Sequence, residues 1–390
     1  MKKINIKKKI IFSFIFLLSI TLFIEIFLRI INIEYPIFQR HDSIRGFSLL
    51  PNSEGIWSRE GKGKVRINSD GLRDYEHKID KPSNTLRIAI LGDSYAEARS
   101  VNIEDTFWFK LSKYLESCKS FHNGKKIEIL NFGVSEYGTT QQYLTLKHHV
   151  WKYSPDLVLL AFYSGNDISD NSKILSTKKY RPYFEFEGDN IKSIDKDFLN
   201  SKPYKILSSN YGQFFIELSQ YSRIAQLFRE FYVQMYFASK RRSNSYSAEK
   251  INEPKAGLYN PINETWSKAW ITTEKIIKLI NKNIKEKGKQ LILVSLSNPV
   301  QVYPSEAYLK EYKKKNNIDD IFYPETRLNK FSKKNSIKLI LTSQIMRKEA
   351  LEKNIFFHGF DNTKLGTGHW NETGHDFASK VISKEICKLY

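Results

Sequence analysis

Ser94 and His369 are the two residues whose types and positions could form a nucleophile and its base. Ser94 lies in residues 92–95 (GDSY), directly after a short apolar run, and His369 lies in residues 368–371 (GHWN), just before a helical run. A serine hydroxyl becomes a nucleophile when an imidazole takes its proton, so the two side chains must meet. The tripeptide GDS by itself would equally well begin a helix, because serine is a common N-cap residue. Other residues must therefore decide between the two interpretations.

Gly133 and Asn166 could supply the hydrogen-bond donors that attack on a carbonyl group needs. Residues 131–133 (NFG) and 165–167 (GND) follow two further apolar runs. A glycine lets the backbone approach a ligand and present its N–H group, and an asparagine presents a side-chain amide. Together with the N–H of Ser94 they would form an oxyanion hole, in which one donor contributes about 2.7–4 kcal/mol.

Five short apolar runs must position these residues. They cover residues 86–91, 127–131, 156–162, 290–296 and 337–341, and amphipathic stretches at 105–116, 141–152, 268–287 and 373–389 lie between or after them. Near-continuous Val/Ile/Leu runs that alternate with helices predict an α/β fold with a parallel sheet covered on both faces. In such sheets the active site lies at the carboxyl ends of the strands, which is where Ser94, Gly133 and Asn166 fall.

Serine, glycine, asparagine and histidine in this order, each after a strand or before the last helix, resemble the SGNH (GDSL-like) hydrolase superfamily over roughly residues 86–390. The resemblance implies a three-layer, flavodoxin-like α/β sandwich. It also implies that Ser94 is the nucleophile and one oxyanion donor, that Gly133 and Asn166 are the other donors, and that His369 is the general base. Members of the superfamily are mostly esterases, lipases, carbohydrate deacetylases and O-acyltransferases.

The acid that should hold the histidine is missing from the expected place. In the superfamily an aspartate precedes the histidine by three or sometimes two residues, where this chain has Gly366 and Thr367. Such an acid fixes the imidazole tautomer and stabilises the imidazolium. A backbone carbonyl, the Thr367 hydroxyl or the more distant Asp361 would have to replace it. We therefore expect a Ser-His dyad, with Asp361 as the alternative acid partner.

The start of the chain predicts a membrane anchor. Residues 1–9 (MKKINIKKK) are basic, and residues 10–33 are apolar apart from a few side chains, among them Glu25 and Arg29, which can pair as i,i+4 neighbours. About twenty such residues cross a hydrocarbon core of roughly 30 Å. The run exceeds the apolar part of a signal peptide and no small-x-small cleavage site follows, so we favour an uncleaved signal anchor over a cleaved signal. The lysines place residues 1–9 in the cytoplasm and the rest of the chain outside the cell membrane.

Residues 34–85 and 170–263 interrupt the alternation of strands and helices. We expect the first segment, which is polar and rich in turns, to be an extracytoplasmic linker and N-terminal extension of a catalytic domain at 86–390. The second is an aromatic and polar insertion, with a flexible loop expected at residues 240–245 (KRRSNS). Its place after the third apolar run predicts a cap or lid beside the active site, and packing on the side of the domain is the alternative.

Composition excludes several other classes of protein. A hydrophobic content of 41% rules out overall disorder. The net charge of +20 comes mostly from scattered lysines without a nucleic-acid-binding module, so we expect no nucleic-acid partner. The two cysteines, Cys118 and Cys387, lack the spacing of metal ligands, so we expect no metal and no cofactor. In an oxidising compartment they are candidates for a disulfide.

These features together predict hydrolysis or transfer of an ester-linked acyl group through an acyl-Ser94 intermediate. The expected substrate, an acylated carbohydrate or glycolipid of the cell envelope, follows from the predicted topology alone. A lipase or lysophospholipase that acts on membrane lipid is the nearest alternative. A non-catalytic envelope binding or assembly protein, which kept the fold and lost the acid, is the alternative from a different class.

Overall fold

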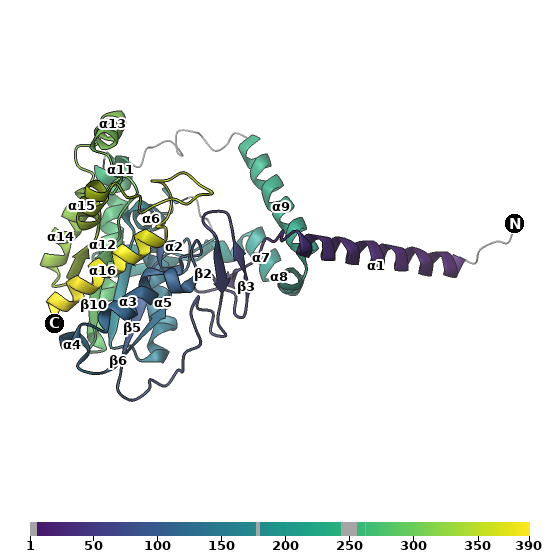
Figure 1. The fold of residues 1–390 in the computed structure, drawn as a ribbon, viewed down its shortest axis with the longest axis horizontal. Coiled ribbons are helices and arrows are strands. Elements are labelled where there is room, and N and C mark those ends of the chain that lie inside the picture. The colour runs from purple at the N-terminus through teal and green to yellow at the C-terminus, as the bar shows by residue number, and fades with distance from the viewer. Residues whose placement is uncertain (1–5, 177–179, 243–255, 262) are drawn as a thin grey trace.

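A parallel sheet forms the centre of the molecule (Figure 1). The computed structural model describes all residues except 1–5, 177–179, 243–255 and 262. The sheet has five strands in the order β11-β10-β7-β5-β6, and every neighbouring pair is parallel. Numbered along the chain this is the 2-1-3-4-5 order of flavodoxin-like folds, so the predicted fold class is confirmed. The strands are β5 (Thr85–Leu91), β6 (Lys126–Asn131), β7 (Leu157–Phe162), β10 (Gln290–Ser295) and β11 (Lys338–Leu341).

Helices cover both faces of this sheet and make the three-layer sandwich. Alternate side chains of a strand point to opposite faces, and accordingly Ile88 and Ile90 of β5 lie in one core while Ala89 and Leu91 lie in the other. The first core is closed by α3 (Phe107–Leu115), α15 (Ser343–Lys353) and α16 (Glu372–Leu389). The second is closed by α5 (Thr139–His148), α12 (Glu264–Glu286) and α14 (Tyr323–Lys334).

The predicted elements agree with the observed ones, with small shifts at their ends. One difference is the stretch at 141–152, where α5 ends at His148 and a separate 3₁₀ turn, η2 (Val150–Tyr153), follows. Short elements complete the sandwich: α2 (Ser94–Glu97), η1 (Ile103–Asp105), α4 (Lys119–His122), α6 (Ser164–Asp170) and α13 (Glu306–Asn316).

The N-terminal extension folds onto the sandwich. It contains two antiparallel hairpins, β1 (Gln39–Asp42) with β2 (Gly46–Leu49) and β3 (Glu54–Trp57) with β4 (Gly63–Arg66). Apolar side chains of the extension share one buried cluster with Val134 and Tyr137 of the loop after β6. Further along, the buried guanidinium of Arg73 donates to the carbonyl oxygens of Glu97, Ala98 and Val101 at 2.5–2.6 Å. The extension is therefore tied to the loop that follows Ser94.

The insertion after β7 begins with a hairpin and continues as helices. Its elements are β8 (Tyr183–Glu187), β9 (Asn190–Asp195), η3 (Asp197–Asn200), α7 (Lys202–Ser208), α8 (Asn210–Tyr221), α9 (Arg223–Arg242) and α11 (Ala256–Tyr259). Residues 240–242, expected in a flexible loop, are instead the last residues of α9, and residues 243–245 lie outside the described part of the chain.

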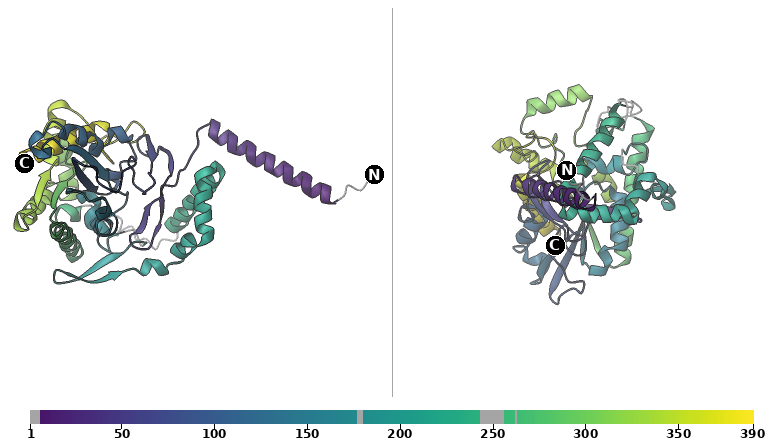
Figure 2. Two further views of the ribbon diagram at one scale, coloured as in Figure 1. Left: turned by 90° about the horizontal axis from the view of Figure 1, so that it is seen from below. Right: turned by 90° about the vertical axis from the view of Figure 1, so that its right-hand side faces the viewer.

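The apolar N-terminal segment is one long helix, α1 (Ile6–Ile30), which projects from the folded body (Figures 1 and 2). By its length and composition this helix is long and apolar enough to cross a membrane. Glu25 and Arg29 form the expected ion pair, at 2.8 Å. The predicted basic tail at residues 1–9 lies partly outside the described residues, and residues 6–9 are the first residues of α1.

Cys118 and Cys387 form the disulfide for which they were candidates. Their Cα atoms lie 5.7 Å apart, within the range that a disulfide requires. The bond joins the segment that follows α3 to α16, the last helix of the chain.

Candidate active site

Ser94 is presented by a tight strand-to-helix turn. It is the first residue of α2, and the carboxylate of Asp93 before it accepts a hydrogen bond from the Tyr95 N–H at 2.9 Å. Gly92 lets this helix start directly at the strand end, because a Cβ there would lie 2.7 Å from the Cβ of Ala96. The turn places the Ser94 hydroxyl at the carboxyl edge of the sheet, as predicted.

His369 meets Ser94 as a base must. Its Nε2 lies 2.8 Å from the Ser94 Oγ, although the two residues are 275 positions apart in the sequence. Nearby, the carbonyl oxygen of Gly368 accepts hydrogen bonds from the Tyr95 hydroxyl at 3.2 Å and from His358 Nδ1 at 2.9 Å. Burial lowers the pKa of His358 to about 3, so this second histidine is neutral and holds the loop without competing for the proton.

Glu60 occupies the place of the missing acid. Its Oε2 lies 2.5 Å from His369 Nδ1, and its Oε1 accepts the backbone N–H of His369 at 2.7 Å. The expectation of a Ser-His dyad with a carbonyl or hydroxyl behind the imidazole is therefore wrong. Asp361, the alternative acid, is exposed to solvent, and Glu60 takes the position on Nδ1 that it would need.

Local features of two loops explain this arrangement. Glu60 lies between β3 and β4, so the N-terminal extension brings it across to the histidine loop. Gly368 adopts a φ of +73°, and a Cβ on it would lie 2.0 Å from Glu60 Oε1. A glycine is therefore required beside His369 for the carboxylate to approach. No motif around Glu60 marks it, which is why the sequence alone did not reveal it.

The charges of this pair reinforce each other. Burial disfavours the imidazolium, but the hydrogen bond and charge of Glu60 outweigh it, so the pKa of His369 is raised above its ordinary 6.5. Burial also disfavours the carboxylate, but His369 outweighs this too and lowers the pKa of Glu60. An ionised carboxylate on Nδ1 stabilises the positive charge that the imidazole gains when it takes a proton.

Asn166 lies at the same edge, on α6. Its Nδ2 donates to Asp93 Oδ2 at 2.9 Å, which leaves the second hydrogen of that amide for another acceptor. Gly165 before it is sterically required, because a Cβ would lie 2.5 Å from the Tyr163 ring and 2.6 Å from the Asn298 amide oxygen. Burial raises the pKa of Asp93 to about 6.

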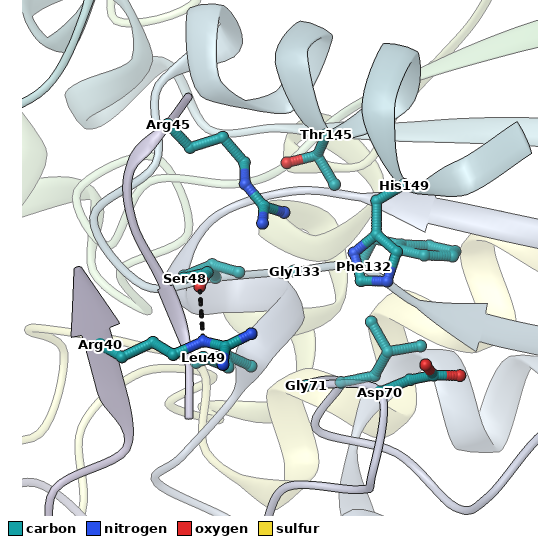
Figure 3. A pocket seen from close by; sticks show the side chains of 12 residues that line it. Arg40, Arg45, Ser48, Leu49, Asp70, Gly71, Phe132, Gly133, Thr145 and His149 are labelled. Atoms are coloured by element: carbon teal, nitrogen blue, oxygen red, sulfur yellow. Dashed lines mark hydrogen bonds between the residues drawn. The ribbon is translucent and has the colours of Figure 1, made fainter. Parts of the chain in front are cut away.

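Gly133 does not take the role expected of it. Its N–H donates to Asn131 Oδ1 at 2.9 Å. It lines a separate cavity, with Arg45 and His149 among its walls (Figure 3), whose lining contains neither Ser94 nor His369. A Cβ on Gly133 would lie 2.4 Å from the Ala96 Cβ, so this glycine allows α2 to pack against the end of β6. In this structure the Gly133 N–H is thus paired with Asn131, and Gly133 does not line the pocket that contains Ser94 and His369.

A cleft of about 480 Å³ opens over Ser94. The N-terminal extension contributes three of its residues, including Trp57, and the loop after β6 contributes Glu136, which adopts a left-handed backbone with φ of 72°. The insertion at residues 170–263 was expected to cap the active site. Among the described residues that line the cleft, it contributes only Asp170, its first residue. The full lining is Gln39, Trp57, Glu60, Ser94, Arg99, Ser100, Ser135, Glu136, Asn166, Ser169, Asp170 and His369.

Comparisons with known proteins found similar folds at low scores. No protein-family model and no curated protein matches the chain. An acetyl xylan esterase has a TM-score of 0.37 at 12% identity, with 76% of this chain and 98% of that chain covered. The acetylxylan esterase Axe2 from Geobacillus stearothermophilus has a TM-score of 0.38 at 10% identity, covering 77% and 94%. A GDSL-like lipase from Bacteroides thetaiotaomicron has a TM-score of 0.32 at 12% identity, covering 78% and 89%. Similarity this low says nothing about the substrate of this chain.

Proposed function

We propose that this chain, which has the sheet order and the Ser-His pairing of an SGNH-type hydrolase fold, cleaves or transfers an ester-linked acyl group through an acyl-Ser94 intermediate. One observation carries the proposal. Ser94 Oγ, His369 and Glu60 form a continuous hydrogen-bonded chain, with 2.8 Å at Nε2 and 2.5 Å at Nδ1. A nucleophile, its base and an acid that orients the base are the parts that serine acyl transfer requires. The presence of the acid also removes the reason to favour a non-catalytic binding protein.

The reaction would run in two half-steps. In the first, His369 Nε2 takes the proton of Ser94 as Oγ attacks the ester carbonyl carbon, and Glu60 stabilises the resulting imidazolium. The Ser94 N–H and the Asn166 amide would hold the oxyanion. His369 then returns the proton to the leaving alcohol as the ester C–O bond breaks. In the second, water or an acceptor hydroxyl repeats the cycle on the acyl-serine, so hydrolysis and transfer share one mechanism.

The lining of the cleft favours an acylated carbohydrate over a membrane lipid. Most of its side chains are polar or charged, with Gln39, Arg99 and Glu136 among them, and the guanidinium of Arg99 lies 5.5 Å from the centre of the Trp57 ring. Sugar hydroxyls hydrogen-bond to such polar groups. A lipase would instead present a long apolar channel for an acyl chain. We therefore propose a carbohydrate or glycolipid of the cell envelope as the substrate class.

Topology supports an envelope substrate. The helix α1 is long and apolar enough to cross a membrane, and lysines precede its apolar part. By the positive-inside rule these lysines would stay in the cytoplasm and the catalytic domain would lie outside. An enzyme held there would meet envelope carbohydrates and glycolipids.

Turnover of p-nitrophenyl acetate by the purified full-length protein tests the proposal. We expect hydrolysis by the unaltered chain, loss of activity in Ser94→Ala, and retained activity in Ser135→Ala, a matched change of another serine in the same cleft. A fluorophosphonate probe should label Ser94. Labelling that persists in Ser94→Ala would show that another residue is the nucleophile, and a folded protein without turnover or labelling would contradict the enzymatic function.

A further inference from the structure

The helices α8 and α9 present their apolar faces outward. On α8 the exposed side chains include Tyr211, Phe214 and Leu218, and on α9 they include Phe228, Phe231 and Met235. Each trio follows i, i+3, i+7 spacing, which places its members on one face of a helix. Tyr211 is 89% exposed and Phe228 is 68% exposed. Large apolar side chains exposed along two successive helices indicate an interaction site.

On α9, two polar side chains are buried against the rest of the protein. Glu230 of α9 is buried and forms an ion pair with Arg59 at 2.6 Å. Gln226, also buried, accepts the backbone N–H of Tyr35 at 2.9 Å and donates to the Ser219 carbonyl at 2.8 Å. This pattern is the reverse of a helix on the surface of a water-soluble domain. The folded body therefore contacts the polar side of α9 and leaves its apolar side exposed, while α8 is attached through the buried Ile216.

The junction of α8 and α9 is attached to one level of α1. The carboxylate of Glu25 accepts hydrogen bonds from the N–H groups of Arg223 at 2.9 Å and Ile224 at 3.1 Å, so it caps the start of α9. Arg29 donates to the carbonyl oxygen of Tyr221 at 2.5 Å. Glu25 lies fifteen residues after Ile10, the start of the apolar run, which is about 22 Å along a helix. The junction therefore lies near the outer end of the apolar part of α1.

The directions of the helices match a membrane surface. In Figures 1 and 2, α1 points away from the folded body, and α9 runs steeply across the direction of α1 from the point where the two meet. If α1 crosses a bilayer, a helix transverse to it at its outer end lies along the bilayer surface. The contacts of Glu230 turn the opposite, apolar face of α9 away from the catalytic domain.

We propose that α8 and α9 lie in the membrane–water interface at the outer end of α1, with their apolar faces among the lipids. The inference rests on the proposed role of α1 as a membrane span. A lipid surface is the occupant that the observations favour, because the apolar faces adjoin a helix that already requires lipid around it. Tyrosine beside phenylalanine and leucine is also the composition of interfacial segments.

If α8 and α9 lie in the interface, the candidate active site is held at a defined distance from the bilayer. Arg59, the partner of Glu230, directly precedes Glu60, the acid on His369. The interfacial helices would therefore fix the catalytic edge at a set distance from the bilayer, instead of leaving it on a free tether. Such a domain would act on acyl esters presented at the membrane surface.

Site-directed spin labelling of the full-length protein tests the seating. Single cysteines would be introduced as Phe228→Cys on α9, Leu17→Cys in α1 and Lys348→Cys on α15, and labelled without reductant because both native cysteines are in the disulfide. The protein would be reconstituted in vesicles of phosphatidylcholine with a minority of phosphatidylglycerol. Collision rates with oxygen, which enters lipid, and with a nickel chelate, which stays in water, would then be compared.

We expect the labels at Phe228 and Leu17 to collide several-fold more with oxygen than with nickel, and the label at Lys348 to favour nickel. A Phe228 label that behaves like the Lys348 label, while Leu17 is in lipid, would overturn the interfacial seating and leave the anchor intact. A Leu17 label exposed to nickel would instead refute the anchor. Shielding of Phe228 from both reagents together with spin–spin broadening would show that a second copy covers α9, which also overturns the proposal.

Discussion

At the scale of single residues, the decisive finding is that the acid comes from far upstream. Glu60 and His369 are 309 positions apart, yet the carboxylate engages both the ring and the backbone N–H of the histidine. The two bonds hold the imidazole plane with its Nε2 toward Ser94. This geometry supports a triad in which the acid was relocated to another part of the fold.

Glu60→Gln should therefore reduce turnover of p-nitrophenyl acetate by roughly a thousandfold or more, because an amide on Nδ1 no longer enforces the productive tautomer. The exposed residue Asp361 provides the control. Asp361→Ala should change kcat by less than about tenfold, since Glu60 already holds the histidine. A large loss in Asp361→Ala, or full activity in Glu60→Gln, would restore the dyad or an Asp361 triad.

The pH dependence of activity should report the same pair. The neutral imidazole is the active base, so kcat/KM should rise with pH as His369 loses its proton, with a midpoint above 6.5 because its pKa is raised. In Glu60→Ala the charge that favours the imidazolium is lost while burial still disfavours it. The midpoint of the residual activity should then shift to lower pH. An unchanged midpoint would show that Glu60 does not set the pKa of His369.

At the scale of elements, the close packing of α2 against two strand ends positions Ser94. Gly92 and Gly133 both face Ala96, and neither could carry a Cβ without a contact shorter than 3 Å. The Asn131 side chain adds to this packing, because its amide donates to the Ala96 carbonyl at 2.9 Å while its oxygen accepts the Gly133 N–H. The glycine of the second motif therefore serves the placement of Ser94.

Gly133→Ala distinguishes this packing role from a donor role. Alanine keeps the backbone N–H, so a residue that acted only as an oxyanion donor would tolerate it. We expect instead a loss of about 1–3 kcal/mol in the free energy of unfolding, measured by urea denaturation in detergent, because the new methyl group overpacks the turn. The double variant Gly133→Ala/Ala96→Gly should recover part of the loss. No change in stability would contradict the packing role.

At the scale of the whole molecule, two segments that are remote in sequence meet around one cleft, and a third holds one of them in place. The sandwich provides Ser94, Asn166 and His369, the N-terminal extension provides Glu60 and Trp57, and α9 of the insertion contacts both the extension and α1. The extension thus connects the proposed anchor to the edge of the sheet where Ser94 lies and forms part of the candidate active site.

The proposed topology can be tested with reporter fusions. Alkaline phosphatase fused after Tyr390 should be active, because this reporter folds only outside the cytoplasm. The fusion protein should remain in the membrane fraction. A fusion made after Lys9, before the apolar run, should be inactive. Recovery of a soluble protein that begins near Tyr35 would show that the segment is a cleaved signal.

The sequence by itself determined the sheet and predicted that Ser94 and His369 would meet. Strands such as β5 and β7 are short apolar runs that are followed by a glycine. Whether such a run is buried as a strand depends on the order of apolar residues within the run itself, which can be read from the sequence. Ser94 and His369 stand at fixed places relative to a strand end and a helix start, so local order was enough to identify them.

Only the tertiary structure decided the acid, the use of the Gly133 N–H and the walls of the cleft. A carboxylate pairs with an imidazole wherever the chain returns to it, and no periodicity records that Glu60 in a turn between β3 and β4 will reach His369. A backbone N–H donates to whichever acceptor folding brings near, here the Asn131 side chain. Local patterns specify elements because burial follows their periodicity, whereas contacts across hundreds of residues depend on how those elements pack.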